Sequence, residues 1–325
     1  MFERAPDAGE IVIQQALQDG NLHKALLDQL EEGIYMVDRD RRILYWNGGA
    51  ERISGYRAHE VAGQFCFGDL LMHCDSDGGV LCGERCPLTG VMQDGRAREC
   101  TLFLRHRQGH RLPVHVQSRP IHNAQGEIIG AVEVFEEAIP AARYDIEALR
   151  TFGCLDPASD AVHRGFGEMK LRHALDKLHS FAIPFGWLRI GLDSAEELEQ
   201  RFGHGMVDAA VRTIAATLNS NLKALDVLTR WERAEFRVEM SLRSPVVLAE
   251  VAEKLLVLVR MSNLEWWGDR VHLAVSIGGV MARRGDTLES LENRVQPVFE
   301  SCRAAGGDRA AVAHSEGREE PACLQ

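Results

Sequence analysis

The stretch that decides the fold of the second half of this chain, Arg230–Phe236, reads Arg-Trp-Glu-Arg-Ala-Glu-Phe. Apolar runs flank it, Val227-Leu228 before and Phe236–Met240 after, so it is predicted to form the tip of a β-hairpin. Tight hairpin turns usually contain Gly, Asn or Asp, because these residues tolerate a positive φ. This tip carries Glu232-Arg233-Ala234 instead. The flanking strands therefore predict a hairpin, and the residues at its tip are unusual for a tight turn.

Composition limits the kinds of partner. The chain has 325 residues, room for about two domains, and a net charge of −11. This charge argues against an extended nucleic-acid partner, because such binding depends on neutralising phosphates. No apolar stretch approaches the roughly 18 residues of a membrane span, and residues 1–7 lack the apolar core of a signal peptide. We therefore expect a cytoplasmic protein, with no membrane partner, whose eight cysteines are thiols or metal ligands.

The first half reads as short strands separated by turns. Strands are predicted at 33–37, 43–46, 99–106, 111–118 and 127–136, with a short helix at 49–55. This order, together with the phrases Ile34–Asp38, Trp46–Tyr56 and Gly126–Val132, resembles a PAS sensor domain. The resemblance implies an antiparallel sheet with short helices.

The second half alternates strands and helices. The pattern predicts a strand at 187–192, one helix with an apolar face from Leu198 to Leu218, the hairpin, a helix at 245–261, a strand at 271–281 and a helix at 288–304. This βαββαβ order is that of a ferredoxin-like domain, so the fold class is α+β. Capping boxes are expected at Ser194–Glu197 and Asp286–Glu289.

The frame at 230–236 resembles the Arg-x-Gly-Gly-Asp/Glu-Glu-Phe signature of the diguanylate cyclase, or GGDEF, family. Further similar phrases are Leu155-Asp156-Pro157, Phe202–Asp208, Val275–Gly278 and Gly306–Arg309. Both glycines and the first acidic residue of the signature are replaced. The chain is thus identified as a PAS sensor domain followed by a degenerate GGDEF domain.

The two resemblances divide the chain into five parts. We expect an N-terminal helical segment at 1–28, the PAS domain at 29–137, a helical linker at 138–154, the degenerate GGDEF domain at 155–315 and a flexible tail at 316–325. In the linker, Ile146, Leu149 and Phe152 recur every three positions, which favours a short helix. The resemblance implies dimer contacts through the N-terminal helix, so a homodimer is expected; a helix that caps its own domain is the alternative.

The resemblance implies a magnesium site whose carboxylate ligands are mostly missing. Cyclases of this family join two GTP molecules, and hard oxygen ligands hold the cations that offset the phosphate charge. The first metal-binding Asp falls on Gly191, and the first acidic residue of the hairpin falls on Ala234. Glu235 and Asp193 remain as residual catalytic candidates. Alternatively, Glu235 is a solvated acid paired with Arg230 or Arg233, and Asp193 favours a helix N-terminus. Magnesium is not expected.

The nucleotide contacts implied by the family are also altered. A carboxylate at Glu196 stands where a phosphate-facing Lys is expected, and Glu199 replaces the Asn that reads guanine. Asp208 and Arg303 are the retained candidates for nucleotide binding. In product-inhibited relatives an Arg-x-x-Asp motif binds cyclic di-GMP; here the same frame reads Lys223 to Asp226. Lys lacks the planar fork of Arg, so an ordinary charge pair in a loop is the alternative.

Four cysteines lie close together in the sequence of the first half. They are Cys66, Cys74, Cys82 and Cys86, with His73 beside them. Such a set is compatible with zinc or an iron–sulfur cluster. A Cys82–Cys86 redox pair and free thiols packed in a small core are the other interpretations.

These observations favour a signalling protein over an active enzyme. The leading hypothesis is that the PAS domain senses a ligand, redox state or metal, and that the degenerate GGDEF domain acts by binding a protein partner, GTP or cyclic di-GMP. One alternative is a low-activity diguanylate cyclase that uses Glu235 and Asp193. Another is a redox- or metal-sensing PAS domain for which the GGDEF domain is a dimer scaffold.

Overall fold

The computed structural model describes residues 20–68, 70–138 and 146–313. The expected helical segment at 1–28 therefore lies mostly outside the described residues, and the expected tail at 316–325 lies wholly outside them. The described part of the N-terminal segment contains helix α2, Gly20–Gln29. In the linker, α6 spans Ile146–Thr151, as the three-residue spacing predicted. None of the described helices is long and apolar enough to cross a membrane.

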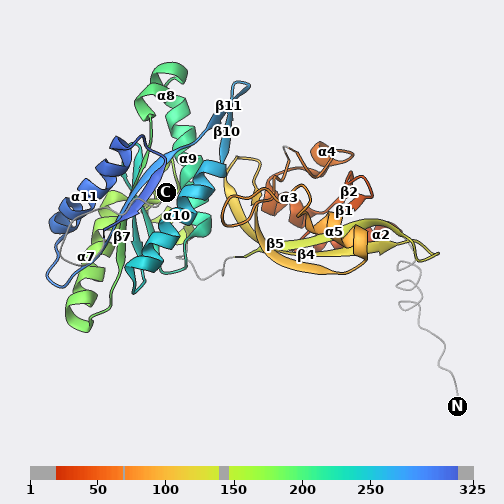
Figure 1. Cartoon of the computed structure of the whole chain (residues 1–325), viewed down its shortest axis with the longest axis horizontal. Helices are drawn as coiled ribbons and strands as arrows, with labels where there is room; N and C mark the ends of the chain where they lie inside the picture. The colour runs from red at the N-terminus through yellow and green to blue at the C-terminus, as the bar shows by residue number, and fades with distance from the viewer. Residues whose placement is uncertain (1–19, 69, 139–145, 314–325) are drawn as a thin grey trace, which may run out of the picture. The chain divides into compact units, whose positions relative to one another are not determined.

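The described residues divide into two compact units (Figure 1): the first holds most of a five-stranded sheet, and the second holds a six-stranded sheet together with residues 74–80 and 103–113. The first is a five-stranded antiparallel sheet in the order β2-β1-β5-β4-β3, which confirms the expected PAS-type architecture. Its elements are β1 Gly33–Asp38, β2 Ile43–Trp46, α3 Gly48–Ser54, α4 Ala58–Val61, α5 Pro87–Asp94, β3 Arg98–Arg105, β4 Arg111–His122 and β5 Ile128–Glu137.

The buried side chain of Asn47 joins the first strand of this unit, β1, to the helix α3. The side-chain oxygen of Asn47 accepts from the N–H of Ala50 at 2.8 Å, which caps α3. The same oxygen accepts from the N–H of Ile34 at 2.7 Å, which ties β1 to the cap. Gly55 ends the helix with a φ of 78°, a left-handed conformation that glycine adopts without strain.

The second unit contains a six-stranded sheet in the order β13-β12-β7-β9-β8-β6. Its elements are β6 Val162–His163, α7 Arg164–Phe181, β7 Gly186–Leu192, α8 Ala195–Phe202, α9 His204–Asn221, β8 Val227–Glu232, β9 Glu235–Met240, α10 Pro245–Met261, β10 Asn263–Trp266, β11 Asp269–His272, β12 Val275–Met281, α11 Leu288–Ala304 and β13 Arg309–Val312. The four strands β12-β7-β9-β8 with α9 and α10 form the predicted βαββαβ core. Strands β6 and β13 extend this sheet by parallel pairing at its two edges.

Three local predictions for this unit were wrong. The single helix expected across Leu198–Leu218 is broken into α8 and α9 at Gly203, whose φ of 83° and ψ of 170° are not helical. The side chain of Ser194 makes no capping hydrogen bond, because its φ of 52° places it in the left-handed region. The second capping box is formed by Thr287 and Ser290, one position after the predicted pair.

The predicted hairpin is confirmed, and its tip needs no glycine. Strands β8 and β9 are antiparallel, with Glu232 opposite Glu235, so Arg233 and Ala234 form the turn. Neither turn residue has a positive φ. The register shifts between Arg230 and Glu232, which is a β-bulge. The turn therefore tolerates side chains at the two positions where the family signature has glycine.

Candidate functional site

The hairpin tip lies beside a cavity of about 780 Å³ at one end of the central strands. Its walls come from the end of β7, the start of α8, the β8–β9 turn, α11 and the loop before β13. The lining residues are Gly191–Glu197, Glu199, Gln200, Val207, Glu232–Glu235, Arg303, Gly306 and Gly307. These include six acidic side chains and two arginines, so the cavity carries an excess of negative charge.

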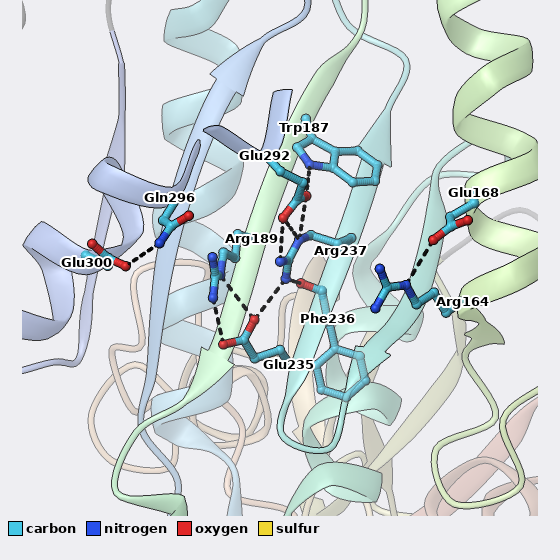
Figure 2. Close-up of polar contacts among 10 residues, drawn as sticks. All are labelled: Arg164, Glu168, Trp187, Arg189, Glu235, Phe236, Arg237, Glu292, Gln296 and Glu300. Atoms are coloured by element: carbon cyan, nitrogen blue, oxygen red, sulfur yellow. Dashed lines mark hydrogen bonds and ion pairs between the residues drawn. The ribbon is translucent and has the colours of Figure 1, made fainter. Parts of the chain in front are cut away.

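Both carboxylate oxygens of Glu235 are held by arginines (Figure 2). Arg189 donates to its two oxygens at 3.1 and 3.0 Å, and Arg237 donates to one of them at 3.1 Å. The prediction of Arg230 or Arg233 as the partner of Glu235 was therefore wrong. A carboxylate bound by two guanidinium groups is a poor ligand for a divalent cation, because the cation would have to displace the arginines.

The network continues from Arg237 to the first turns of α11 (Figure 2). Arg237 donates to both oxygens of Glu292, the shortest distance being 2.7 Å from Nη2, and the indole N–H of Trp187 donates to the same carboxylate at 2.9 Å. The Arg237 side chain is only 2% exposed, so its charge depends on these two carboxylates. Glu235 thus belongs to a buried structural ion-pair network.

A side chain at position 191, where the family resemblance predicts a metal-binding Asp, would have no free space. A Cβ atom placed on Gly191 would lie 2.7 Å from the Cζ atom of Phe299, a ring that is 1% exposed. Arg189 lies over the same ring, with its guanidinium carbon 4.5 Å from the ring centre. Residue 191 therefore cannot take a carboxylate side chain without displacing a buried aromatic ring.

Asp193 has a structural role that the sequence did not indicate. Its two carboxylate oxygens accept from the hydroxyl of Ser276 and from the N–H of Asp308, both at 2.8 Å. It thereby ties the end of β7 to β12 and to the loop before β13. These contacts account for the position of its carboxylate, and the stabilisation of a helix N-terminus stays a prediction.

The position expected to read guanine is closed by an ion pair. Arg233 donates from Nη1 and Nη2 to the two oxygens of Glu199 at 2.6 and 2.8 Å, and His204 contacts the same carboxylate. Arg233 stands where the family has glycine, and Glu199 where it has asparagine. Two substitutions therefore combine into one bridge across the cavity.

The other nucleotide-binding candidates are not gathered in one place. Arg303 lines the cavity, whereas Asp208 is exposed on α9 and does not line it. Asp226 accepts from the N–H groups of Lys223 and Ser241, at 2.9 and 3.2 Å, so its carboxylate shapes a turn. Lys223 and Asp226 line a separate cavity of about 190 Å³.

The cysteines predicted as one set are divided between the two units. Cys66, Cys82 and Cys86 belong to the first unit. Cys74 lies in the segment 74–80, which is grouped with the second unit together with residues 103–113, and it packs with Phe103 from the end of β3 and with Leu258. Burial raises the pKa of the Cys66 thiol, and raises that of Cys82 to about 11. Within the described ranges, no group of three His, Cys, Asp or Glu side chains could hold a metal ion. The expected site at four cysteines and His73 is therefore not assembled.

Glu133 is a buried acid beside the thiols of the first unit. It is 1% exposed, and its oxygens accept from the hydroxyls of Tyr35 at 2.7 Å and Ser118 at 3.0 Å. Burial raises the pKa of Glu133 to about 7, although these two hydrogen bonds oppose the shift. Between pH 4.5 and about 7, Glu133 therefore keeps a proton in the folded state that it has lost in the unfolded chain.

The stability contributed by Glu133 should be complete below pH 4.5 and should be lost as the pH rises to about 7. Replacing Glu133 with Gln, which still accepts hydrogen bonds, should remove this slope from the first unit. Hydrogen exchange of β1 and β5 peptides, corrected for intrinsic rates, measures this unit separately. Glu239→Gln is the control, because the pKa of Glu239 is also raised to about 7 by burial, but in the second unit. An unchanged slope in Glu133→Gln would contradict the assignment.

Known proteins similar to this chain match both units. A model of the PAS fold matches residues 22–137, and a model described as diguanylate cyclase, GGDEF domain, matches residues 154–309. The chain is 24% identical over 303 residues to the probable diguanylate cyclase DgcE of Escherichia coli K12, covering 89% of this chain and 26% of that protein. It is 29% identical over 126 residues to the response regulator PleD of Caulobacter vibrioides, covering 38% of this chain and 28% of that protein.

Among solved structures, the GGDEF domain of DgcB from Caulobacter crescentus, in complex with c-di-GMP, is similar with a TM-score of 0.48 and 17% identity. That match covers 50% of this chain and 94% of the DgcB chain. The chain spans only 26% and 28% of the curated relatives DgcE and PleD. The matched ranges coincide with the two sheets described above, so this chain contains a PAS domain followed by a domain of the GGDEF, or diguanylate cyclase, family.

Proposed function

We propose that this protein is a signalling protein of a cyclic di-GMP network whose GGDEF domain acts by binding a protein partner and not by making cyclic di-GMP. The observation that carries the proposal is the pairing of the Glu235 carboxylate with two arginines. The one acidic residue left in the hairpin signature has both oxygens bound by Arg189 and Arg237.

Two further observations support the same conclusion from different parts of the cavity. The ring of Phe299 fills the space of the missing Asp at position 191. The Arg233–Glu199 bridge occupies the side expected to read guanine. The first change removes a metal ligand that the cyclase reaction requires. The second removes the contact to the guanine base. Together they favour loss of the reaction over adjustment of its rate.

The excess of acidic side chains also argues against a nucleotide in this cavity. Glu196, Glu197 and Glu232 line it, are exposed, and make no ion pair in the described structure. A triphosphate would approach these carboxylates without enough cations to neutralise it, since Arg233 is already paired with Glu199. The surface that remains favours a partner that presents basic groups.

Calorimetry of the purified chain tests the proposal. Titration with GTP in the presence of magnesium, and separately manganese, is expected to give no binding heat. Cyclic di-GMP is also expected not to bind, because the Asp226 carboxylate is engaged by backbone N–H groups. Saturable binding of GTP with a micromolar dissociation constant would overturn the proposal. An active diguanylate cyclase under the same conditions serves as the positive control.

Restoring the two glycines of the hairpin tip tests the role of the bridge. Glu232→Gly with Arg233→Gly removes the Arg233–Glu199 pair, whose arginine side chain is 51% exposed. Because the pair is exposed, the free energy of unfolding should fall by no more than about 1 kcal/mol from this loss. We expect the variant to remain unable to bind GTP with magnesium, as the carboxylates at 191 and 234 are still absent. Gain of GTP binding in this variant, by the same calorimetry, would show that the bridge alone blocks the site.

A further inference from the structure

Three cysteines of the first unit, Cys66, Cys82 and Cys86, are called here the thiol cluster. The carbonyl oxygen of Arg41 accepts from the N–H of Cys66 at 3.0 Å, and its guanidinium donates to the carbonyl oxygen of Cys82 at 2.9 Å. The three thiols are close enough to one another to interact electrostatically. They come from separate turns of the chain, so the fold brings them together.

The chain between Cys82 and Cys86 turns back on itself. The N–H of Cys86 donates to the carbonyl oxygen of Gly83 at 3.2 Å, which closes a tight turn over the exposed residues 83–85. Cys82 directly precedes this turn and Cys86 is its last residue, so the turn directs the chain back toward Cys82, as a disulfide between the two requires. Cys82 is partly exposed and Cys86 is buried beneath the turn. A small reagent can therefore approach the pair from the solvent side of this loop.

Cys86 differs from the other two thiols in its place on a helix. It is the N-cap residue of α5, its side chain makes no capping hydrogen bond, and Pro87 follows it. The hydroxyl of Thr89, three residues after the cap, is buried and has no hydrogen-bond partner in the described structure. That is the position from which a side chain reaches back to the cap in a capping box. The Cys86 sulfur therefore lies at the N-terminal end of α5, where the helix dipole favours negative charge.

We propose that Cys82 and Cys86 form a reversible disulfide and make the first unit a site of thiol oxidation by low-molecular-weight disulfides. The Cys86 thiolate attacks one sulfur of the oxidant, which forms a mixed disulfide and releases one thiolate. The Cys82 thiolate, after giving up its proton to solvent, then attacks the Cys86 sulfur and expels the second thiolate. The two protein thiols lose two electrons and two protons, and the oxidant is reduced to two thiols.

Oxidation would change contacts on the sheet side of the loop. The Cys82 thiol accepts a hydrogen bond from the backbone N–H of His73, and the Cys82 carbonyl is held by Arg41 between β1 and β2. Drawing the Cys82 sulfur toward Cys86 breaks the first contact and strains the second. The disulfide is thereby coupled to the β1–β2 turn of the first unit.

The test uses the full chain, reduced and purified without oxygen, and glutathione disulfide as the oxidant. After incubation, remaining thiols are blocked with N-ethylmaleimide, and the protein is digested without reduction for peptide mass spectrometry. The expected product is a peptide with a Cys82–Cys86 bond that dithiothreitol reverses. Cys82→Ser should stop at a glutathione adduct on Cys86, whereas Cys86→Ser should acquire none at Cys82. Cys100→Ser, a half-buried thiol of β3, is the matched control and should behave as the unaltered chain.

Three outcomes would overturn the proposal. They are a bond that joins Cys66 to either partner, equal oxidation of Cys82 in the Cys86→Ser chain, and stoichiometric zinc or iron bound by the thiol cluster of the purified protein. A further measurement does not depend on the folding of a variant. In the unaltered folded chain, iodoacetamide should label Cys86 at least about tenfold faster than Cys66, because burial raises the pKa of the Cys66 thiol and so lowers its thiolate fraction. Equal labelling rates would also overturn the proposal.

Discussion

Replacing Arg237 with Ala should lower the free energy of unfolding of the second unit by about 3–5 kcal/mol. The guanidinium is 2% exposed and lies between the carboxylates of Glu235 and Glu292. Removing it leaves the indole N–H of Trp187 as the hydrogen-bond donor to Glu292, and leaves Arg189 as the guanidinium paired with Glu235. Urea unfolding followed by tryptophan fluorescence measures the loss, because Trp187 and Trp231 lie next to the network.

Two controls separate this buried network from ordinary surface charge. Glu168→Ala removes the exposed pair with Arg164, also drawn in Figure 2, and should cost no more than about 1 kcal/mol. Arg237→Met combined with Glu292→Leu removes both charges and should be less harmful than Arg237→Ala alone. An Arg237→Ala chain as stable as the Glu168→Ala chain would contradict the account of the network.

The same network should weaken in acid. Burial raises the pKa of Glu292, but the hydrogen bonds and charge of Arg237, with the hydrogen bond from Trp187, outweigh it and hold the pKa below its ordinary value. A lowered pKa in the folded state gives stability that is present above the unfolded value of 4.5 and is lost as the pH falls below it. The Arg237→Met, Glu292→Leu chain should lack this loss when urea unfolding is repeated at decreasing pH.

Restoring the missing metal-binding acid at position 191 should destabilise the protein and should not restore a cyclase. The Cβ atom of Gly191→Asp would approach the Phe299 ring to 2.7 Å, and overpacking of this kind costs about 1–3 kcal/mol. Adding Ala234→Glu supplies the other acid of the signature. The pair of substitutions is expected to give a less stable chain that forms no cyclic di-GMP, because Glu235 stays bound by arginines.

A double-mutant cycle with Phe299→Leu tests whether the ring is the cause. If it is, Gly191→Asp should cost less in the Phe299→Leu background than in the unaltered chain. Gly83→Asp is the matched control, because a Cβ atom at Gly83 meets nothing within 4 Å. Unchanged stability of Gly191→Asp, with metal-dependent turnover of GTP, would show that Phe299 moves aside and that the site is only one substitution from activity.

Local pattern was enough to predict the five strands of the first sheet and the four central strands of the second, because each of these is marked by apolar residues and each turn by polar ones. The edge strands β6 and β13 and the β10–β11 hairpin were not predicted. The hairpin at 227–240 is an example, since its flanks fix the pairing whatever the tip contains. The buried network could not be read in the same way. Arg189 and Arg237 lie directly opposite each other on β7 and β9. Charged residues inside two apolar strands were the available signal, but the strand pairing was needed to show that they share carboxylates.

The sequence identified single candidate residues, but it did not identify the residues that contact them. Glu235 was identified from the signature, yet its partners come from β7 and from within β9, at positions that the signature does not mark. Asp193 was placed at a helix start, but its partners Ser276 and Asp308 are more than 80 residues away in sequence. The four cysteines were grouped by proximity in sequence, whereas Cys74 belongs to a different unit. Contacts between distant segments decided each of these cases.

The most direct test of the central claim is a turnover assay. The purified chain is incubated with GTP and magnesium, and separately with manganese, and cyclic di-GMP is quantified by liquid chromatography and mass spectrometry against an active cyclase. The account predicts no product above the protein-free background with either metal. Cyclic di-GMP formed at enzyme-like rates, and lost on replacement of Glu235 with Gln, would contradict it.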